Sequence, residues 1–117
     1  MRTSSNSRKR GAEAERRARR FYRLRGYRVL AENVWAGGYE LDLVVRRGGC
    51  LVFCEVKAKL GEGYGLPAEM VGVEKQRRLR RAAVAWLGGH PHLAGLEIRF
   101  DVLAVTPRGV TRVAADF

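Results

Sequence analysis

The sequence LVFCEVKAKL, residues 51–60, has the pattern of a central β-strand. It is apolar at nearly every position until its second half, where Glu55, Lys57 and Lys59 fall on one face. An ionised carboxylate or ammonium is costly to bury unless it is paired or bound to a metal. This stretch therefore predicts a buried strand that ends in a charged site.

A second strand, residues 40–46, lies just before it, and the turn signal Arg-Gly-Gly at 47–49 separates the two. The alternation predicts an apolar face made of Leu41, Leu43 and Val45. Asp42 and Glu40 then fall on the opposite face. A tight hairpin between these strands would bring Asp42 to the face that carries Glu55.

Two carboxylates beside a lysine have two interpretations. They can hold a hard divalent cation, which lowers the pKa of bound water and polarises a phosphoryl oxygen, while the lysine positions water or stabilises charge on the phosphate. They can equally form an ordinary cross-strand ion pair on a solvated sheet face. Spacing alone favours the ion pair.

The remaining pattern predicts one domain over residues 11–117 after a disordered basic arm, residues 1–10, which is rich in Ser and Arg and has no apolar periodicity. The other predicted elements are a helix at 11–25, a strand at 27–32, a loop at 61–67, a helix at 73–87, a strand at 97–105 and a short edge strand at 109–113. The predicted order is α-β-β-β-α-β, with an optional last strand.

Composition limits the partners and the compartment. The 117 residues include 23 Lys and Arg against 12 Asp and Glu, a net charge of +11 that attracts polyanions, nucleic acid first and an anionic membrane surface second. No apolar run approaches the roughly 20 residues that span a bilayer, so we expect no membrane insertion.

Cys50 and Cys54 would lie about 13 Å apart along one strand, too far for a disulfide. We expect a cytoplasmic protein, and the Cys and His spacing fits no usual zinc finger.

Several motifs occur in a specific order along the chain. They are Gly11-x-x-Ala14-Glu15-x-x-Ala18, Gly26-Tyr27, Glu40-Leu41-Asp42-Leu43-Val44, Val52-Phe53-Cys54-Glu55-Val56-Lys57, Tyr64-Gly65, Lys75-Gln76, Arg99-Phe100-Asp101-Val102 and Ala115-Asp116-Phe117. With the element order, this set resembles the PD-(D/E)xK nuclease superfamily. It is most similar to the YraN-type family of bacterial proteins, predicted endonucleases that resemble archaeal Holliday-junction resolvases.

The resemblance implies a restriction-endonuclease-like fold, an α/β core with a mixed central sheet flanked by helices. It implies Asp42 and Glu55 as ligands of Mg²⁺ or Mn²⁺, with the Val56 carbonyl as a third ligand and Lys57 as the catalytic lysine. Glu15 matches a helix glutamate that completes the acidic cluster in resolvase-like nucleases. An alternative role for Glu15 is to interact with the macrodipole in the first turn of its helix.

The chain departs from the pattern at two positions. Leu41 stands where the superfamily name has Pro, and Tyr39 precedes Glu40 where the YraN-type family more often has Gly. Neither change removes a charged site residue. We expect Tyr39 to alter access to the site.

A second group of residues is predicted to bind nucleic acid. These residues are Lys59, Tyr64, Lys75, Gln76, Arg77, Arg78 and Arg81. The arginines would contact phosphates, and Tyr64 would stack on an unpaired base. The alternatives are a solvated helix face for the charges and a packed loop aromatic for Tyr64. Asp101 is interpreted as a structural partner of an arginine or a helix N-terminus.

The sequence thus favours a metal-dependent endonuclease that acts on DNA rather than RNA, with branched or structured DNA as the expected substrate. Because resolvases cut two symmetric strands, a homodimer is a candidate assembly. The first alternative is a nucleic-acid-binding module that keeps the nuclease fold without catalysis. A third, weaker alternative is an RNA- or ribosome-associated factor.

Overall fold

The computed structural model describes residues 2–58 and 72–115, so Lys59 and Tyr64 lie outside the described residues, as does the predicted loop at 61–67. The strands are β1 (Arg28–Ala36), β2 (Tyr39–Arg47), β3 (Cys50–Ala58), β4 (Glu97–Thr106) and β5 (Gly109–Ala115). The helices are α1 (Arg2–Arg23), α2 (Val73–Gly88) and the short 3-10 helix η2 (Pro91–Leu93). The predicted order of helices and strands is confirmed, and η2 is an addition to it.

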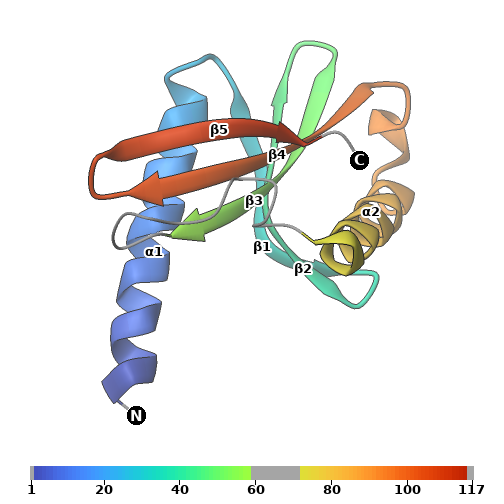
Figure 1. Ribbon diagram of the computed structural model, residues 1–117. Helices are drawn as coiled ribbons and strands as arrows, with labels where there is room; N and C mark the ends of the chain where they lie inside the picture. Colours follow the sequence, from blue (N-terminus) through green and yellow to red (C-terminus); the bar gives the residue numbers. More distant parts are fainter. Residues whose placement is uncertain (1, 59–71, 116–117) are drawn as a thin grey trace.

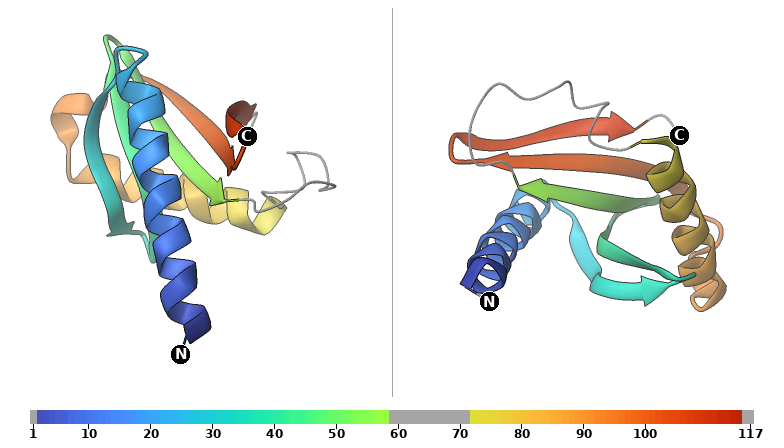
Figure 2. Two further views of the ribbon diagram at one scale, coloured as in Figure 1. Left: turned by 90° about the vertical axis from the view of Figure 1, so that its left-hand side faces the viewer. Right: turned by 60° about the horizontal axis from the view of Figure 1, so that its bottom comes forward.

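The five strands form one mixed sheet in the order β1-β2-β3-β4-β5. Neighbours pair antiparallel except β3 and β4, which are parallel. Parallel strands need a crossover connection, and here the crossover contains α2. The two helices lie on opposite faces of the curved sheet, α1 on one and α2 on the other (Figure 1 and Figure 2). The predicted α/β class is therefore confirmed.

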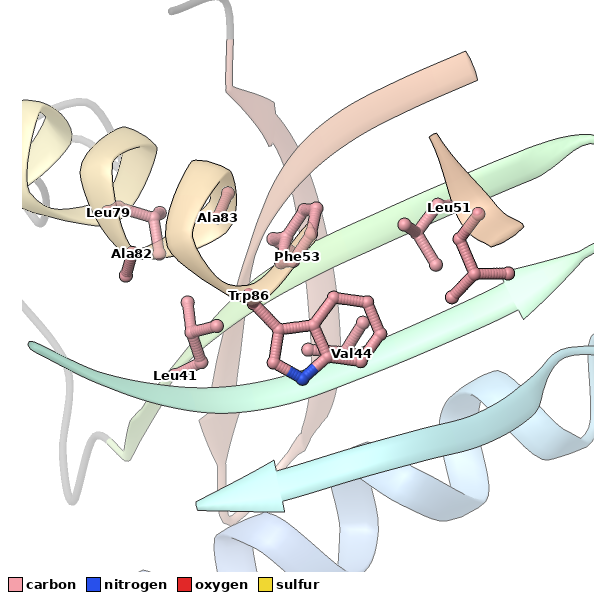
Figure 3. Close-up of a cluster of buried hydrophobic side chains, with 9 residues drawn as sticks. Leu41, Val44, Leu51, Phe53, Leu79, Ala82, Ala83 and Trp86 are labelled. Atoms are coloured by element: carbon pink, nitrogen blue, oxygen red, sulfur yellow. The ribbon is translucent and has the colours of Figure 1, made fainter. Parts of the chain in front are cut away.

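Each helix covers its own hydrophobic core. On the α2 side, Leu79, Ala82, Ala83 and Trp86 recur at helical spacing and pack on the sheet around fully buried Phe53 (Figure 3). On the α1 side, Tyr22 and Ala18 pack on Val52, Cys54 and their neighbours. Alternate side chains along β3 therefore pack in the two different cores, as the strand pattern predicted.

Helix α1 is longer than its apolar pattern. The pattern predicts a start near residue 11, whereas the helix runs from Arg2 and takes in the segment for which the sequence predicted a disordered arm. The buried stripe begins only at Ala14, and the first turns of the helix project beyond the sheet (Figure 1). Neither helix is both long enough and apolar enough to cross a membrane within the described residues.

The predicted alternation along β2 is wrong at one position. Leu41 belongs to the core under α2, whereas Leu43 and Val45 belong to the core under α1. The break falls at Asp42, just beyond Leu43 and Cys54, the last residues that β2 and β3 pair. There the Asp42 side chain accepts the hydrogen bond that a ladder carbonyl would otherwise accept.

Candidate active site

The two carboxylates of the predicted site lie where β2 and β3 stop pairing. The Val56 N–H donates to Asp42 Oδ2 at 2.9 Å, which fixes the carboxylate at the edge of β3. The N–H and C=O of a strand residue point to the same edge, so the Val56 carbonyl is directed toward this gap as well. The predicted proximity of Asp42 to the Glu55–Lys57 segment is therefore confirmed.

Glu55 is buried, with 6% of its surface exposed, and each of its oxygens has a partner. Lys75 Nζ lies 3.2 Å from Oε2, and the Tyr39 hydroxyl donates to Oε1 at 3.4 Å. The sequence predicted Lys75 as a nucleic-acid contact and Tyr39 as a residue that alters access to the site. It did not predict that Lys75 forms an ion pair with Glu55, although the spacing of Lys75 four residues before buried Leu79 was the available signal.

Two lysines meet beside this carboxylate. The pKa of Lys57 is lowered, chiefly by its hydrogen bond with Lys75, then by burial and by the charge of Lys75. Burial lowers the pKa of Lys75 too, but hydrogen bonds with Lys57 and Glu55 and the charge of Glu55 raise it overall. Lys75 therefore keeps its proton next to Glu55, and Lys57 is the lysine shifted toward the neutral amine.

A stable ion pair lowers the pKa of a carboxyl group, whereas the pKa of Asp42 is raised. Burial, followed by the charge of Glu55, raises the pKa of Asp42 to about 7, and the charges of Glu15 and Glu40 contribute. Only the Val56 N–H is a lowering influence among the leading causes. Burial and Glu55 also raise the pKa of Tyr39 to about 12. The charged form of Asp42 is thus disfavoured in the absence of a cation, and a cation beside it would stabilise that form.

The acidic groups near Asp42 offer few ligands for a divalent cation. Among residues 2–58 and 72–115, no three His, Cys, Asp or Glu side chains are grouped closely enough to hold a metal. Glu15 accepts a hydrogen bond of 3.1 Å from Asn33 Nδ2 and acts on Asp42 by charge. The donors that fit a cation are the carboxylates of Asp42 and Glu55 and the Val56 carbonyl. These are hard oxygen ligands, and Mg²⁺ commonly retains several waters.

Sequence comparison adds the family. The model of the uncharacterised protein family UPF0102 matches residues 14–105. The chain belongs to this family. This confirms the predicted YraN-type family.

Relatives in UPF0102 match most of the chain. A UPF0102 protein of Parvibaculum lavamentivorans is 48% identical over 106 residues, which covers 91% of this chain and 78% of the relative. One from Synechococcus sp. (strain JA-3-3Ab) is 43% identical over 114 residues, covering 92% and 86%. The family match contains Asp42, Glu55, Lys57 and Lys75.

The predicted nucleic-acid contacts of this UPF0102 chain gather on α2. Gln76 is half-buried in its first turns, and Arg81 is exposed. Arg77 and Arg78 form exposed ion pairs with Glu74, at 3.3 and 3.4 Å. Exposed pairs of this kind are weak, so these arginines are able to exchange Glu74 for a phosphate. Their role in binding stays a prediction.

Asp101 has the structural role that the sequence predicted, with arginine partners. It is fully buried, and Arg99 Nε and Arg112 NH1 contact Oδ1 at 3.1 and 3.3 Å. The Tyr22 hydroxyl donates to Oδ2 at 2.7 Å, a contact the sequence did not suggest. In the UPF0102 chain this network ties α1 to β4 and β5 and is separate from the Asp42 site.

Proposed function

We propose that this protein is a divalent-metal-dependent endonuclease that hydrolyses phosphodiester bonds of DNA, at branched or otherwise structured sites. The observation that carries the proposal is the convergence of two carboxylates and two lysines at the open end of the β2–β3 pair. The pKa of Asp42, raised to about 7 by burial and neighbouring acids, identifies a site that favours a cation.

Asp42, Glu55 and the Val56 carbonyl would hold Mg²⁺ or Mn²⁺. When bound, such an ion lowers the pKa of a coordinated water and stabilises charge on the phosphoryl oxygens. The Val56 N–H keeps the Asp42 carboxylate at the edge of β3. Lys75 Nζ lies 3.2 Å from Glu55 Oε2. Binding a cation at this oxygen requires Lys75 to move away, toward an incoming phosphate.

Lys57 has the properties of a group that positions water and takes part in proton transfer. Its pKa is lowered by the hydrogen bond with Lys75 and by burial, which brings the amine closer to the pH at which it can exchange a proton. General acid–base groups work best when their pKa lies near the working pH. Lys75, whose pKa is raised, then supplies the positive charge beside the incoming phosphate.

The element order and strand pairing support a restriction-endonuclease-like fold. The two antiparallel strands β2 and β3, followed by the crossover helix α2 and the parallel strand β4, agree with the α-β-β-β-α-β core of that fold. The net charge of +11 supports a polyanionic substrate. Cutting two symmetric strands of a branched DNA would require a homodimer.

The test is metal-dependent cleavage of branched, flap, single-stranded and duplex DNA, with matched RNA for comparison. We expect cleavage with Mg²⁺ or Mn²⁺ that is abolished by EDTA and by Glu55→Gln or Lys57→Ala. Arg23→Gln is the control, because it removes one exposed charge at the C-terminal end of α1, close to the β2–β3 turn and away from the site. Cleavage that persists in either site variant would overturn the assignment.

One observation favours a second candidate, a nucleic-acid-binding module without catalysis. Lys75 and Tyr39 satisfy both oxygens of Glu55 without a metal. Calorimetric titration with Mn²⁺ separates the two functions. Salt-sensitive DNA binding with no metal uptake and no cleavage would favour the binding module.

A further inference from the structure

A cleft lies far from the carboxylates, at the end of the sheet that carries the β2–β3 turn. It has a volume of about 670 Å³. Its charged and aromatic lining comes from β1, β2, the end of α2 and the segment that follows α2, and none of its lining residues is acidic. The lining groups used below are Arg28, Arg46, Arg47, Trp86 and His90.

The arginines of this cleft repel one another. Arg28 and Arg46 are directly opposite each other in the β1–β2 pairing, an arrangement of like charges that destabilises a sheet. Arg46 Nε donates to the Gly48 carbonyl at 2.8 Å, and Arg47 NH1 donates to the Arg25 carbonyl at 3.0 Å. None of the ion pairs found in the described part of the chain involves these arginines. An anion bridging them would relieve the repulsion.

An aromatic pair forms another wall of the cleft. The rings of Trp86 and His90 stack with centroids 3.8 Å apart and planes 16° apart. His90 Nδ1 lies 2.8 Å from the Trp86 carbonyl oxygen and must donate to it, because a carbonyl only accepts. The imidazole is therefore held in a fixed plane beside the arginines. Guanidinium groups next to flat rings suit phosphate and nucleobase recognition.

We propose that this cleft binds a phosphate group of a nucleic-acid strand, as a second contact outside the Asp42 site. The ligand class rests on the proposed function, because it takes nucleic acid as the partner. Lys75 lies near the start of α2 and His90 just past its end, and a helix of 16 residues is about 24 Å long. One DNA molecule can reach both sites.

The test measures binding of labelled duplex DNA by fluorescence anisotropy, in EDTA so that nothing is cut. The double variant Arg28→Gln/Arg46→Gln is compared with Arg16→Gln/Arg108→Gln, which removes the same charge elsewhere. Loss of the one phosphate that the two arginines bridge should make the slope of log K against log salt shallower by about 1. Between about 50 and 200 mM salt, affinity of the cleft variant would then fall about 4-fold less than that of the wild type. The control should keep a slope near that of the wild type.

Two further measurements check that the cleft variant is folded and that DNA contacts the cleft. Thermal melting should show the cleft variant folded, since the substitutions remove a like-charge repulsion. Nuclear magnetic resonance of the wild type should show the Trp86 indole and the His90 ring shifting when DNA is added. A cleft variant with the same affinity and slope as the control would overturn the proposal, as would a wild type that binds no DNA. A protein that binds DNA through this cleft but cuts nothing would leave this inference standing and refute the proposed catalysis.

Discussion

Asp42→Asn should stabilise the folded protein at neutral and alkaline pH when no divalent metal is present. Burial and the charges of Glu55, Glu15 and Glu40 raise the pKa of this carboxyl from an ordinary 3.8 to about 7. A carboxyl whose pKa is raised on folding contributes stability below its unfolded pKa and loses it as pH rises through the folded pKa. The asparagine can still accept the Val56 N–H but carries no charge.

The size of the effect follows from the pKa values. A rise of about three pH units is worth about 4 kcal/mol at most, and we expect about 2 kcal/mol because Glu15 and Glu40 are screened by solvent. The free energy of unfolding in urea should be equal for the two proteins near pH 4. The difference should grow toward pH 7 and level off above it. Titrating groups that do not interact with Asp42 are common to both proteins and cancel.

When a divalent metal is present, we expect the wild type and not the variant to gain stability. Mn²⁺ should stabilise the wild type and leave Asp42→Asn almost unchanged, because a ligand that binds only the folded state raises its stability. An asparagine variant that is no more stable than the wild type at pH 8 in EDTA would refute the electrostatic reasoning. Equal stabilisation of both proteins by Mn²⁺ would refute Asp42 as a ligand.

Three further perturbations test other parts of the structure. Lys75→Met should raise the pKa of Lys57 toward its ordinary value, because the lysine–lysine hydrogen bond is the largest cause of its lowering; a ¹⁵N titration of the amine measures this. Tyr22→Phe removes a 2.7 Å hydrogen bond to buried Asp101 and should cost about 1.5–3 kcal/mol of unfolding free energy in urea. Gly37→Ala should lower the melting temperature, because a Cβ there would lie 3.0 Å from a backbone carbonyl of α2 and φ is +60°; a cost of about 1–3 kcal/mol is expected.

Each of these has a contrasting outcome. An unchanged pKa of Lys57 in Lys75→Met would contradict the coupling of the two amines. A Tyr22→Phe protein as stable as the wild type would show that Asp101 is satisfied by its arginines alone. Gly38→Ala is the control for Gly37→Ala, since φ is +80° there but a Cβ meets nothing within 4 Å. Equal losses at the two glycines would show that backbone strain, not contact with α2, sets the cost.

The sequence predicted β3, β4 and the second helix closely because their periodicity is local, but it ended the first strand at 32, whereas β1 (Arg28–Ala36) runs four residues further. The strand predicted at 51–60 is β3 (Cys50–Ala58), and the helix predicted at 73–87 is α2 (Val73–Gly88). It failed on β2, where a strict alternation would keep Leu41 and Leu43 on one face. A side chain that accepts a backbone hydrogen bond, as Asp42 does, breaks the period without any mark in the residue pattern.

The candidate site was predicted only in part, because one of its contacts is local in sequence and the others depend on tertiary packing. Asp42 and the Glu55–Lys57 segment are joined by a short hairpin, so their proximity follows from sequence. Lys75 reaches Glu55 only through the packing of α2 on the sheet. The distal cleft joins Arg28 and Arg46 to His90, more than forty residues further along the chain. Such contacts depend on tertiary packing, which single-chain periodicity does not encode.

The most direct test of the central claim, that Asp42 and Glu55 share a divalent cation, is anomalous X-ray diffraction from a crystal soaked in Mn²⁺. The expected result is an anomalous peak within coordination distance of both carboxylates, with the Lys75 amine displaced from Glu55. Occupancy should be lost in Asp42→Asn. A crystal in which Lys75 still contacts Glu55 and no peak lies between the carboxylates at saturating Mn²⁺ would contradict the claim.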